Sequence, residues 1–411
     1  MNSGTDNGGF DPGLNGLPPL TLYVHLPWCV SKCPYCDFNS HQAPSKLPAR
    51  EYVDALLADL ELDLPLVWGR TVHSIFFGGG TPSLFSAKWI ERLIEGFRAR
   101  LRVSPQAECT LEANPGTTEY DSFSAYAEVG INRISLGVQS FNNTLLQRLG
   151  RIHGCAEIET AVESIQCAGI SNFNIDLMYA LPGQSVVDAL DDVRRALDCS
   201  PSHLSYYQLT IEPNTAFHAN PPVLPNDDAA WDMQEQCGDL LMESGFRQYE
   251  ISAWAREGFR CRHNLNYWQY GDFLGIGAGA HSKITLPAEQ SVRRRVRQRH
   301  PRTWLKAMQT GQWLAEDRLI GEEDRVFEFF LNQLRLYDGV RKEQFTQRTG
   351  VSWSRVSVRV AKAIESGLLT DSDGLLKPTS LGWRFTNDIQ AIFLPSGLGK
   401  KPQTAYNMRL H

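Results

Sequence analysis

Regular alternation between two kinds of segment places the strongest restriction on the fold of this 411-residue chain. Short runs rich in β-branched and aromatic residues are followed by longer segments in which apolar residues recur with helical period. Tyr52, Leu56 and Leu60, for example, fall on one helical face. Repeated βα units of this kind form a parallel sheet, with the reactive loops at the carboxyl ends of its strands. The predicted strands are Thr21–Leu26, Val72–Phe77, Glu108–Glu112, Arg133–Leu136, Phe173–Asp176, His203–Gln208 and Gln248–Ser252.

The last quarter of the chain has a different pattern. The arginine-dense stretch Arg293–Arg302 is predicted to be an exposed loop that marks a boundary. Helical patterns and a hairpin with an Asp-Gly turn then predict a small helical domain with a wing. These elements are Glu322–Leu336, Lys342–Thr349, Ser354–Ser366, Leu368–Thr370 and Leu375–Lys377. The predicted division is a disordered tail 1–18, a βα domain 19–290, a linker with the arginine-rich loop 291–320, a C-terminal domain 321–395 and a tail 396–411.

Composition narrows the class of protein. The chain is 42% hydrophobic and 21% charged, which is typical of a globular protein with a large core. A net charge of -6 argues against a protein whose whole surface binds polyanions. The sequence has no apolar run long enough to cross a bilayer, and residues 1–18 contain no apolar signal core, so we expect a cytoplasmic protein.

Three of the nine cysteines lie close together directly after the first predicted strand. Cys29, Cys33 and Cys36 have the spacing C-x-x-x-C-x-x-C, which lets a short loop bring three thiolates to an iron-sulfur cube. Three protein ligands leave the fourth iron of a 4Fe-4S cluster open to a small chelating molecule. The alternative is a structural zinc site with His25 or His41 as fourth ligand.

Polar residues and glycines recur where the next predicted strands end, at the positions where a barrel presents its ligands. A glycine run lets backbone groups approach a ligand closely, although it also suits a tight strand-to-helix turn. The polar side chains could equally be half-buried hydrogen-bonding residues of the scaffold. The residues concerned are Gly79, Gly80, Thr81, Glu112, Gln139, Arg151 and Asp176.

A third group is the sequence His263-Asn-Leu-Asn-Tyr267-Trp268. A histidine beside aromatic residues is a candidate axial ligand for heme iron, with Tyr267 and Trp268 packing on the macrocycle. A histidine in such a setting is also a common core residue. His281 is a second, weaker candidate for the ligand.

The cysteine loop resembles that of the radical S-adenosylmethionine (SAM) superfamily. Its flanking residues are similar to those of the oxygen-independent coproporphyrinogen III oxidase group. Within that group, Cys-Asp-Phe-Asn from Cys36 and the H-N-x-x-Y-W pattern from His263 resemble the HemW branch of heme chaperones. The resemblance extends from Leu20 into the C-terminal domain. It implies an α/β fold, with a radical-SAM-type partial (βα)6 barrel and a small helical, winged-helix-like C-terminal domain of HemN type.

The resemblance also implies roles for individual residues. Cys29, Cys33 and Cys36 would hold the 4Fe-4S cluster. The implied SAM contacts are Tyr23, Phe38, Gly79, Gly80, Thr81, Glu112, Gln139, Arg151 and Asp176. His263, Tyr267 and Trp268 would bind heme, and no catalytic residue is assigned.

Three functions are compatible with these observations. The first is a chaperone that binds heme and delivers it to an apo-hemoprotein; a membrane-bound respiratory acceptor, a homodimer and peripheral contact with the inner membrane are further expectations. The second is a coproporphyrinogen oxidase, but Asp37 and Phe38 follow Cys36 where that enzyme's signature has another cysteine. The third is a DNA-binding C-terminal domain, which the modest excess of six Lys or Arg over two Glu in Gly339–Gly367 does not favour. We expect the chaperone and no nucleic-acid partner, and the sequence does not decide whether SAM is cleaved.

Overall fold

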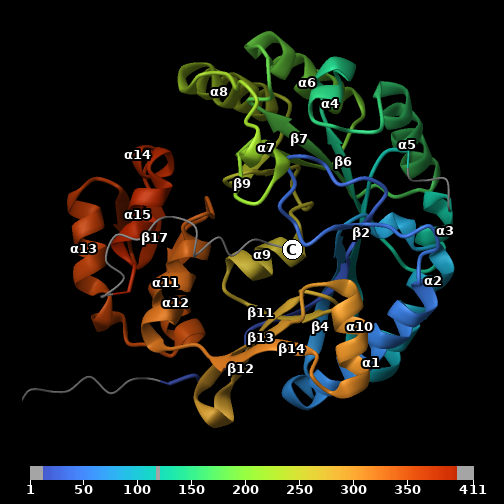
Figure 1. Ribbon diagram of the computed structural model, residues 1–411. Helices are drawn as coiled ribbons and strands as arrows, with labels where there is room; N and C mark the ends of the chain where they lie inside the picture. Colours follow the sequence, from blue (N-terminus) through green and yellow to red (C-terminus); the bar gives the residue numbers. More distant parts are fainter. Residues whose placement is uncertain (1–12, 117–120, 396–411) are drawn as a thin grey trace, which may run out of the picture.

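Six parallel strands form the centre of the protein (Figure 1). The computed structural model describes residues 13–116 and 121–395. The strands are adjacent in chain order, with parallel pairing throughout. They are β1 (Leu20–Leu26), β4 (Thr71–Gly79), β5 (Arg102–Ala113), β6 (Arg133–Gln139), β7 (Phe173–Tyr179) and β8 (His203–Gln208). This open, curved sheet confirms the predicted partial (βα)6 barrel, and the carboxyl ends of its strands meet at one mouth.

Helices cover the outer face of the curved sheet (Figure 1). Several begin where a side chain satisfies the first N–H groups: Asn142 Oδ1 accepts from the N–H groups of Thr144 and Leu145, and Ser185 forms a capping box with Asp188. Most of their buried faces pack against the strands in one core, whereas Phe217 of α7 and Leu145 of α4 belong to a smaller cluster. The helices are α1 (Ala49–Val67), α2 (Ala87–Arg100), α3 (Phe123–Glu128), α4 (Asn143–Arg148), α5 (Cys155–Cys167), α6 (Val186–Asp198), α7 (Ala216–Ala219) and α8 (Asp227–Glu243). No helix in the described ranges has both the length and the apolar composition needed to cross a membrane.

Strands at both edges extend the sheet. After β8 come β10 (Ala253–Ala255) and β9 (Arg247–Glu250), both antiparallel to their neighbours. Beyond β1, the added strands are β11 (Asp272–Ile276), which is parallel to β1, and the antiparallel strands β12 (His281–Leu286), β13 (Ser291–Arg297) and β14 (Leu314–Leu319). Helix α9 (Arg262–Trp268) precedes β11, and α10 (Pro301–Thr310) follows β13.

The arginine-rich segment is a strand, so the predicted loop at Arg293–Arg302 is wrong. Arg297 is fully buried, and its Nε lies 3.2 Å from Asp59 Oδ1 while its Nη2 lies 2.5 Å from Asp63 Oδ2. Arg294 is also buried and pairs with Glu328 at 2.9 Å. Carboxylates from α1 and from the C-terminal domain neutralise these guanidinium groups, which is why an arginine-rich run can lie inside the fold. The sequence alone shows no partner for them.

The C-terminal domain has the predicted helices and hairpin, and its apolar residues form a core of their own. The helix at 322–333 lies within its predicted range, and the helix at 342–349 coincides with its predicted range. The predicted wing is formed by β16 and β17. The elements are α11 (Glu322–Gln333), β15 (Val340–Arg341), α12 (Lys342–Thr349), the 3-10 turn Trp353–Arg355, α13 (Ser357–Glu365), β16 (Leu369–Ser372), β17 (Leu375–Pro378), α14 (Ser380–Arg384) and α15 (Thr386–Ile392).

The exact domain limits stay a prediction. Most of the predicted tail 1–18 and all of the tail 396–411 lie outside the described residues. Within residues 13–18, Leu14 is buried against Val292 and Ile320, and its N–H donates to Gln290 Oε1 at 2.7 Å. The chain is therefore anchored to the sheet before β1 begins.

Substitution of Arg297 by Met should lower the free energy of unfolding by about 3 to 5 kcal/mol, because it leaves the buried carboxylate of Asp59 without its cation and leaves Asp63 with Arg295 as its remaining partner. The matched control is Arg318→Met, since Arg318 pairs with Glu316 on the surface and both side chains are more than two-fifths exposed. The control should cost about 1 kcal/mol or less. Urea unfolding of both variants measures the difference, and equal losses would contradict a role for the buried ion pairs.

Candidate functional site

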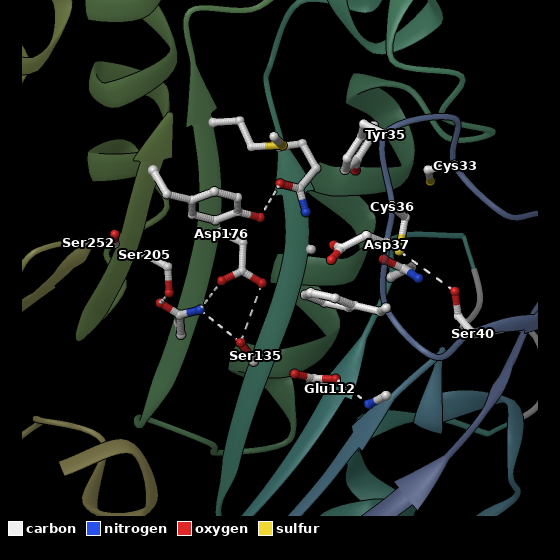
Figure 2. Close-up of a pocket in the computed structure, with 18 of the residues that line it drawn as sticks. Cys33, Tyr35, Cys36, Asp37, Ser40, Glu112, Ser135, Asp176, Ser205 and Ser252 are labelled. Carbon is white, nitrogen blue, oxygen red and sulfur yellow. Dashed lines mark hydrogen bonds between the residues drawn. The ribbon is translucent and has the colours of Figure 1, made fainter. Parts of the chain in front are cut away.

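A cavity of about 720 Å³ lies inside the barrel and opens beside the cysteine loop. Figure 2 shows the cysteine loop on one side of it and Ser135, Asp176 and Ser205 on the opposite side, with Glu112 between them. Twelve of the fifteen predicted site residues line this cavity. They are Cys29, Cys33, Cys36, Phe38, Gly79, Gly80, Thr81, Glu112, Gln139, Arg151, Asp176 and Trp268.

The cysteine loop is held by its own backbone. The N–H of Cys36 donates to Cys33 O at 3.1 Å, which forms a tight turn between these two ligands. Lys32 Nζ donates to the carbonyls of Phe38 and Ser40, at 3.2 and 3.1 Å, and so closes the loop. The three thiols therefore face one cavity from a fixed loop.

The surroundings of the three cysteines favour thiolates bonded to a metal over free thiolates. Burial raises the pKa of Cys29 to about 11, although Thr81 lowers it, and burial also raises the pKa of Cys36. An isolated thiolate is thus disfavoured, and a bond to iron would compensate for the lost hydration. Arg151 Nη1 lies 3.5 Å from Cys33 Sγ and supplies a positive charge at that ligand. This donor set fits three ligands of a 4Fe-4S cluster.

Hydrogen bonds engage both ring nitrogens of His25 and one of His41, the two histidines of the zinc alternative. His25 Nε2 lies 3.0 Å from the carbonyl of Asn39, and His41 Nε2 lies 3.1 Å from Asn39 Oδ1. Because a carbonyl only accepts, His25 carries its proton on Nε2, and its Nδ1 accepts from the hydroxyl of Tyr23 at 3.1 Å. Neither ring nitrogen of His25 is therefore left to bind zinc.

The glycine turn after β4 is packed against the start of the cysteine loop. The N–H of Gly80 donates to Leu26 O at 2.8 Å, and the N–H of Thr81 donates to Trp28 O at 2.7 Å. A Cβ atom at Gly80 would lie 2.5 Å from Trp28 O, so no larger residue fits there. Gly79 has φ +116°, a conformation that side chains disfavour. Glycine is thus required at both positions for a close backbone contact.

Glu112 projects from the end of β5 toward this turn. Its Oε2 accepts from the N–H of Gly79 at 3.0 Å. Burial, and secondarily the nearby charge of Asp176, raise the pKa of Glu112 to about 8, while the bond from Gly79 lowers it. A carboxyl with so high a pKa is largely protonated at neutral pH, and a cationic group placed beside it would favour its charged form.

Arg151, Gln139 and Asp176 are each held by hydrogen bonds. Arg151 Nη2 donates to Asn114 Oδ1 and to Gly137 O, each at 2.7 Å. Gln139, with φ 73°, ends β6, and its Oε1 accepts from the hydroxyl of Tyr207 at 2.8 Å. Asp176 Oδ1 accepts from Asn174 Nδ2 at 2.7 Å (Figure 2).

Three predicted residues do not line the cavity: Tyr23, His263 and Tyr267. Tyr23 is 3% exposed and packs with Phe76 behind the cavity wall. His263 is 5% exposed, its ring centroid lies 4.9 Å from that of Phe76, and its Nδ1 lies 3.1 Å from Ser74 Oγ. Burial, and then the charge of Arg133, lower the pKa of His263 to about 3. The ring is therefore neutral and part of the core in this structure.

Several residues that line the cavity escaped sequence reasoning. Arg133, Ser135 and Gly137 share the inward face of β6 with Gln139, so the period of a strand could have indicated them. The C-terminal domain adds Leu331, Asn332, Arg335, Asn387 and Gln390 to the wall. Contacts between domains of this kind leave no signal in the local sequence pattern.

Comparison with known families and proteins agrees with this geometry. A family model of the radical SAM superfamily matches residues 23–196, and one of the HemN C-terminal domain matches residues 320–385. The heme chaperone HemW of Haemophilus influenzae is 48% identical over 382 residues, covering 92% of this chain and 98% of that protein. The heme chaperone HemW of Escherichia coli is also 48% identical, over 378 residues that cover 92% of this chain and 99% of that protein.

One solved structure has a similar fold along nearly the whole chain. Coproporphyrinogen III oxidase (HemN) from Escherichia coli, described as a radical SAM enzyme, matches with a TM-score of 0.77 and 22% identity over 92% of this chain and 90% of that one. This likeness shows the shared fold alone. The identity to full-length HemW proteins shows the family and confirms the resemblance found in the cysteine loop. The chain belongs to the HemW family of the radical SAM superfamily.

Proposed function

We propose that this protein is a heme chaperone that binds a 4Fe-4S cluster, SAM and heme, and transfers heme to apo-hemoproteins. The observation that carries the proposal is the 48% identity over nearly the full length of proteins named heme chaperones. Phe38, two residues after Cys36, lines the cavity at the position where the coproporphyrinogen oxidase signature has a further cysteine.

Cys29, Cys33 and Cys36 would hold the cluster, and Arg151 would place its charge beside Cys33. When bound, such a cluster would supply an electron to SAM through the iron that lacks a protein ligand. Glu112 would accept the SAM ammonium group next to Gly79. Gln139 and Asp176 would present polar atoms from neighbouring strands to the rest of that molecule.

We also propose that His263 ligates heme iron and that Tyr267 and Trp268 contact the macrocycle. A ring that is 5% exposed can reach a macrocycle only if α9 moves away from β4. Asn332 Nδ2 of α11 donates to Tyr267 O at 3.1 Å, so this movement would involve the C-terminal domain. Trp268 already lines the cavity and marks the direction in which α9 would open.

The proposal also covers the acceptor, the cellular location and the oligomeric state of the protein. We propose a cytoplasmic protein that reaches a membrane-bound respiratory acceptor at the inner membrane and that forms a homodimer. The similarity to named heme chaperones supports an acceptor that is an apo-hemoprotein in general. Co-sedimentation with inner-membrane vesicles and light scattering of the purified protein test location and oligomeric state separately.

Cluster binding should depend on each of the three cysteines. After anaerobic reconstitution, Cys29→Ala, Cys33→Ala or Cys36→Ala should lose most of the sulfide-to-iron charge-transfer absorption, because the loop supplies all the protein ligands. The matched control is Cys155→Ala, since Cys155 does not line the cavity and its thiol instead donates to Phe141 O. The control should retain full absorption, and zinc in place of iron would contradict the assignment.

SAM binding should depend on pH through Glu112. A carboxyl with a pKa near 8 must lose its proton to pair with an ammonium group, so SAM affinity should rise by up to about tenfold between pH 6 and 7. The rise should level off near pH 8, where the ammonium group itself begins to deprotonate. Equilibrium dialysis with cluster-loaded protein should show weaker and pH-independent binding for Glu112→Gln; an unchanged pH profile in that variant would exclude this role.

Heme titration tests the chaperone itself. Cluster-loaded protein should develop a Soret shift with heme and should then restore the activity of an apo-hemoprotein. His263→Ala should weaken or abolish the shift, whereas the control His281→Ala should not, because His281 lies at the start of β12 outside the cavity. Formation of divinyl porphyrinogen from coproporphyrinogen III under reducing, oxygen-free conditions would instead identify an enzyme.

A further inference from the structure

The cavity extends along the inside of the barrel, from the carboxyl ends of the strands toward their amino ends. Arg133 begins β6 and Gln139 ends it, so their Cα atoms lie about 20 Å apart at the rise of a strand, yet both line the cavity. Helix α9 precedes β11, whose first residue pairs with Leu20 at the start of β1. Its residues Asn264 and Trp268 therefore line the end opposite the cysteine loop. We call this end, with Arg133 on one wall and Trp268 on another, the deep chamber.

Arg133 is a buried cation that lacks a bonded partner. Its side chain is 2% exposed and lines the cavity. Its Nε is buried with no hydrogen-bond partner, and no hydrogen bond or ion pair within the described ranges involves this guanidinium. Burying an unpaired charge is costly, and proteins retain such a group where a ligand supplies the missing partner.

The acidic residues near Arg133, which are Glu108, Glu112 and Asp176, are bonded to other groups, and Glu112 accepts from the N–H of Gly79. Glu108 Oε1 accepts from the backbone N–H groups of Arg262 and His263, at 2.9 and 3.2 Å. Asp176 accepts from Asn174 and from the hydroxyl of Ser135. Their charges act on Arg133 from a distance, but none of these carboxylates meets its N–H groups. The planar donor face of the guanidinium is left for a group that enters the cavity.

The other arginine of the deep chamber differs in this respect. Arg335, from α11, donates its Nε to Glu250 Oε1 at 2.7 Å and covers the ring of Trp268 with its guanidinium 4.3 Å from the ring centroid. Phe76 and Trp268 add aromatic surface to the chamber. The chamber thus joins one unpaired guanidinium to apolar walls, which suits a flat, apolar molecule that carries a carboxylate.

We propose that Arg133 binds a carboxylate in the deep chamber, and that the carboxylate is a propionate of the tetrapyrrole. The identification of the ligand as a tetrapyrrole rests on the proposed function. SAM also carries a carboxylate, which would pair with Arg133 in the same way. Bidentate pairing would satisfy the guanidinium that the protein leaves unbonded. It would also orient the macrocycle with its propionate edge toward the amino-terminal end of β6.

The experiment compares a porphyrin with its esterified form. Cluster-loaded, anaerobic protein is titrated with protoporphyrin IX and with its dimethyl ester, followed by porphyrin fluorescence, and with SAM by equilibrium dialysis. The wild type should bind the free acid about 10- to 100-fold more tightly than the ester. Arg133→Gln should abolish this ratio by weakening the acid alone, Arg133→Lys should retain part of it, and SAM affinity should stay unchanged.

Arg335→Gln is the matched control, because it removes a guanidinium from the same chamber that Glu250 already pairs. It should keep the ratio of acid to ester. Urea unfolding should show little change for Arg133→Gln, since no hydrogen bond is lost. If Arg133→Gln nevertheless fails to fold, Arg133→Lys, which retains the charge, provides the test in its place.

Each remaining outcome decides between the two proposals. An unchanged acid-to-ester ratio in Arg133→Gln with unchanged SAM binding overturns the carboxylate site while leaving the chaperone standing. A selective loss of SAM binding in Arg133→Gln keeps the carboxylate site and assigns it to SAM. If the wild type binds neither heme nor porphyrin and Arg133→Gln binds SAM normally, both proposals fail.

Discussion

The site depends on the backbone contact between the glycine turn after β4 and the start of the cysteine loop. Two hydrogen bonds and the bare Cα of Gly80 bring the two segments together, and a single Cβ would separate them. This contact sets the three thiols above the strand ends, and it also positions the N–H of Gly79 against Glu112. The parallel sheet supplies the platform, but the packing at Gly80 decides where the cysteine loop lies on it.

Much of this arrangement follows from the sequence. Strands buried on both faces give apolar runs that are easily recognised, and parallel strands collect their terminal residues at one mouth. Glu112, Gln139 and Asp176 could therefore be placed at a common site before any coordinates were known. The spacing of the cysteines likewise predicted that their loop gathers three thiols at one site, because a short segment has few ways to present three thiols together.

What the sequence could not show has a common cause, since it concerns side chains whose partners are distant in the chain. From the sequence, Arg297 is predicted to lie on the surface, because its partners Asp59 and Asp63 are more than 200 positions earlier in the chain. For His263, the sequence likewise does not show that Ser74 and Phe76 from β4 surround it in the folded core, and its role as a heme ligand stays a proposal. Local pattern cannot show which charges and rings meet across a sheet, because packing against distant elements determines them.

The share of the cavity wall that comes from the C-terminal domain has a consequence for biosynthesis. Asn387 and Gln390 are among the last described residues of the chain, yet they face the same space as Cys29 near its beginning. A nascent chain on the ribosome can form the barrel early, since domains fold as they emerge. Its interior nevertheless stays open on one side until the C-terminal domain has also emerged and folded, so capture of a guest inside a closed chamber has to wait for that domain.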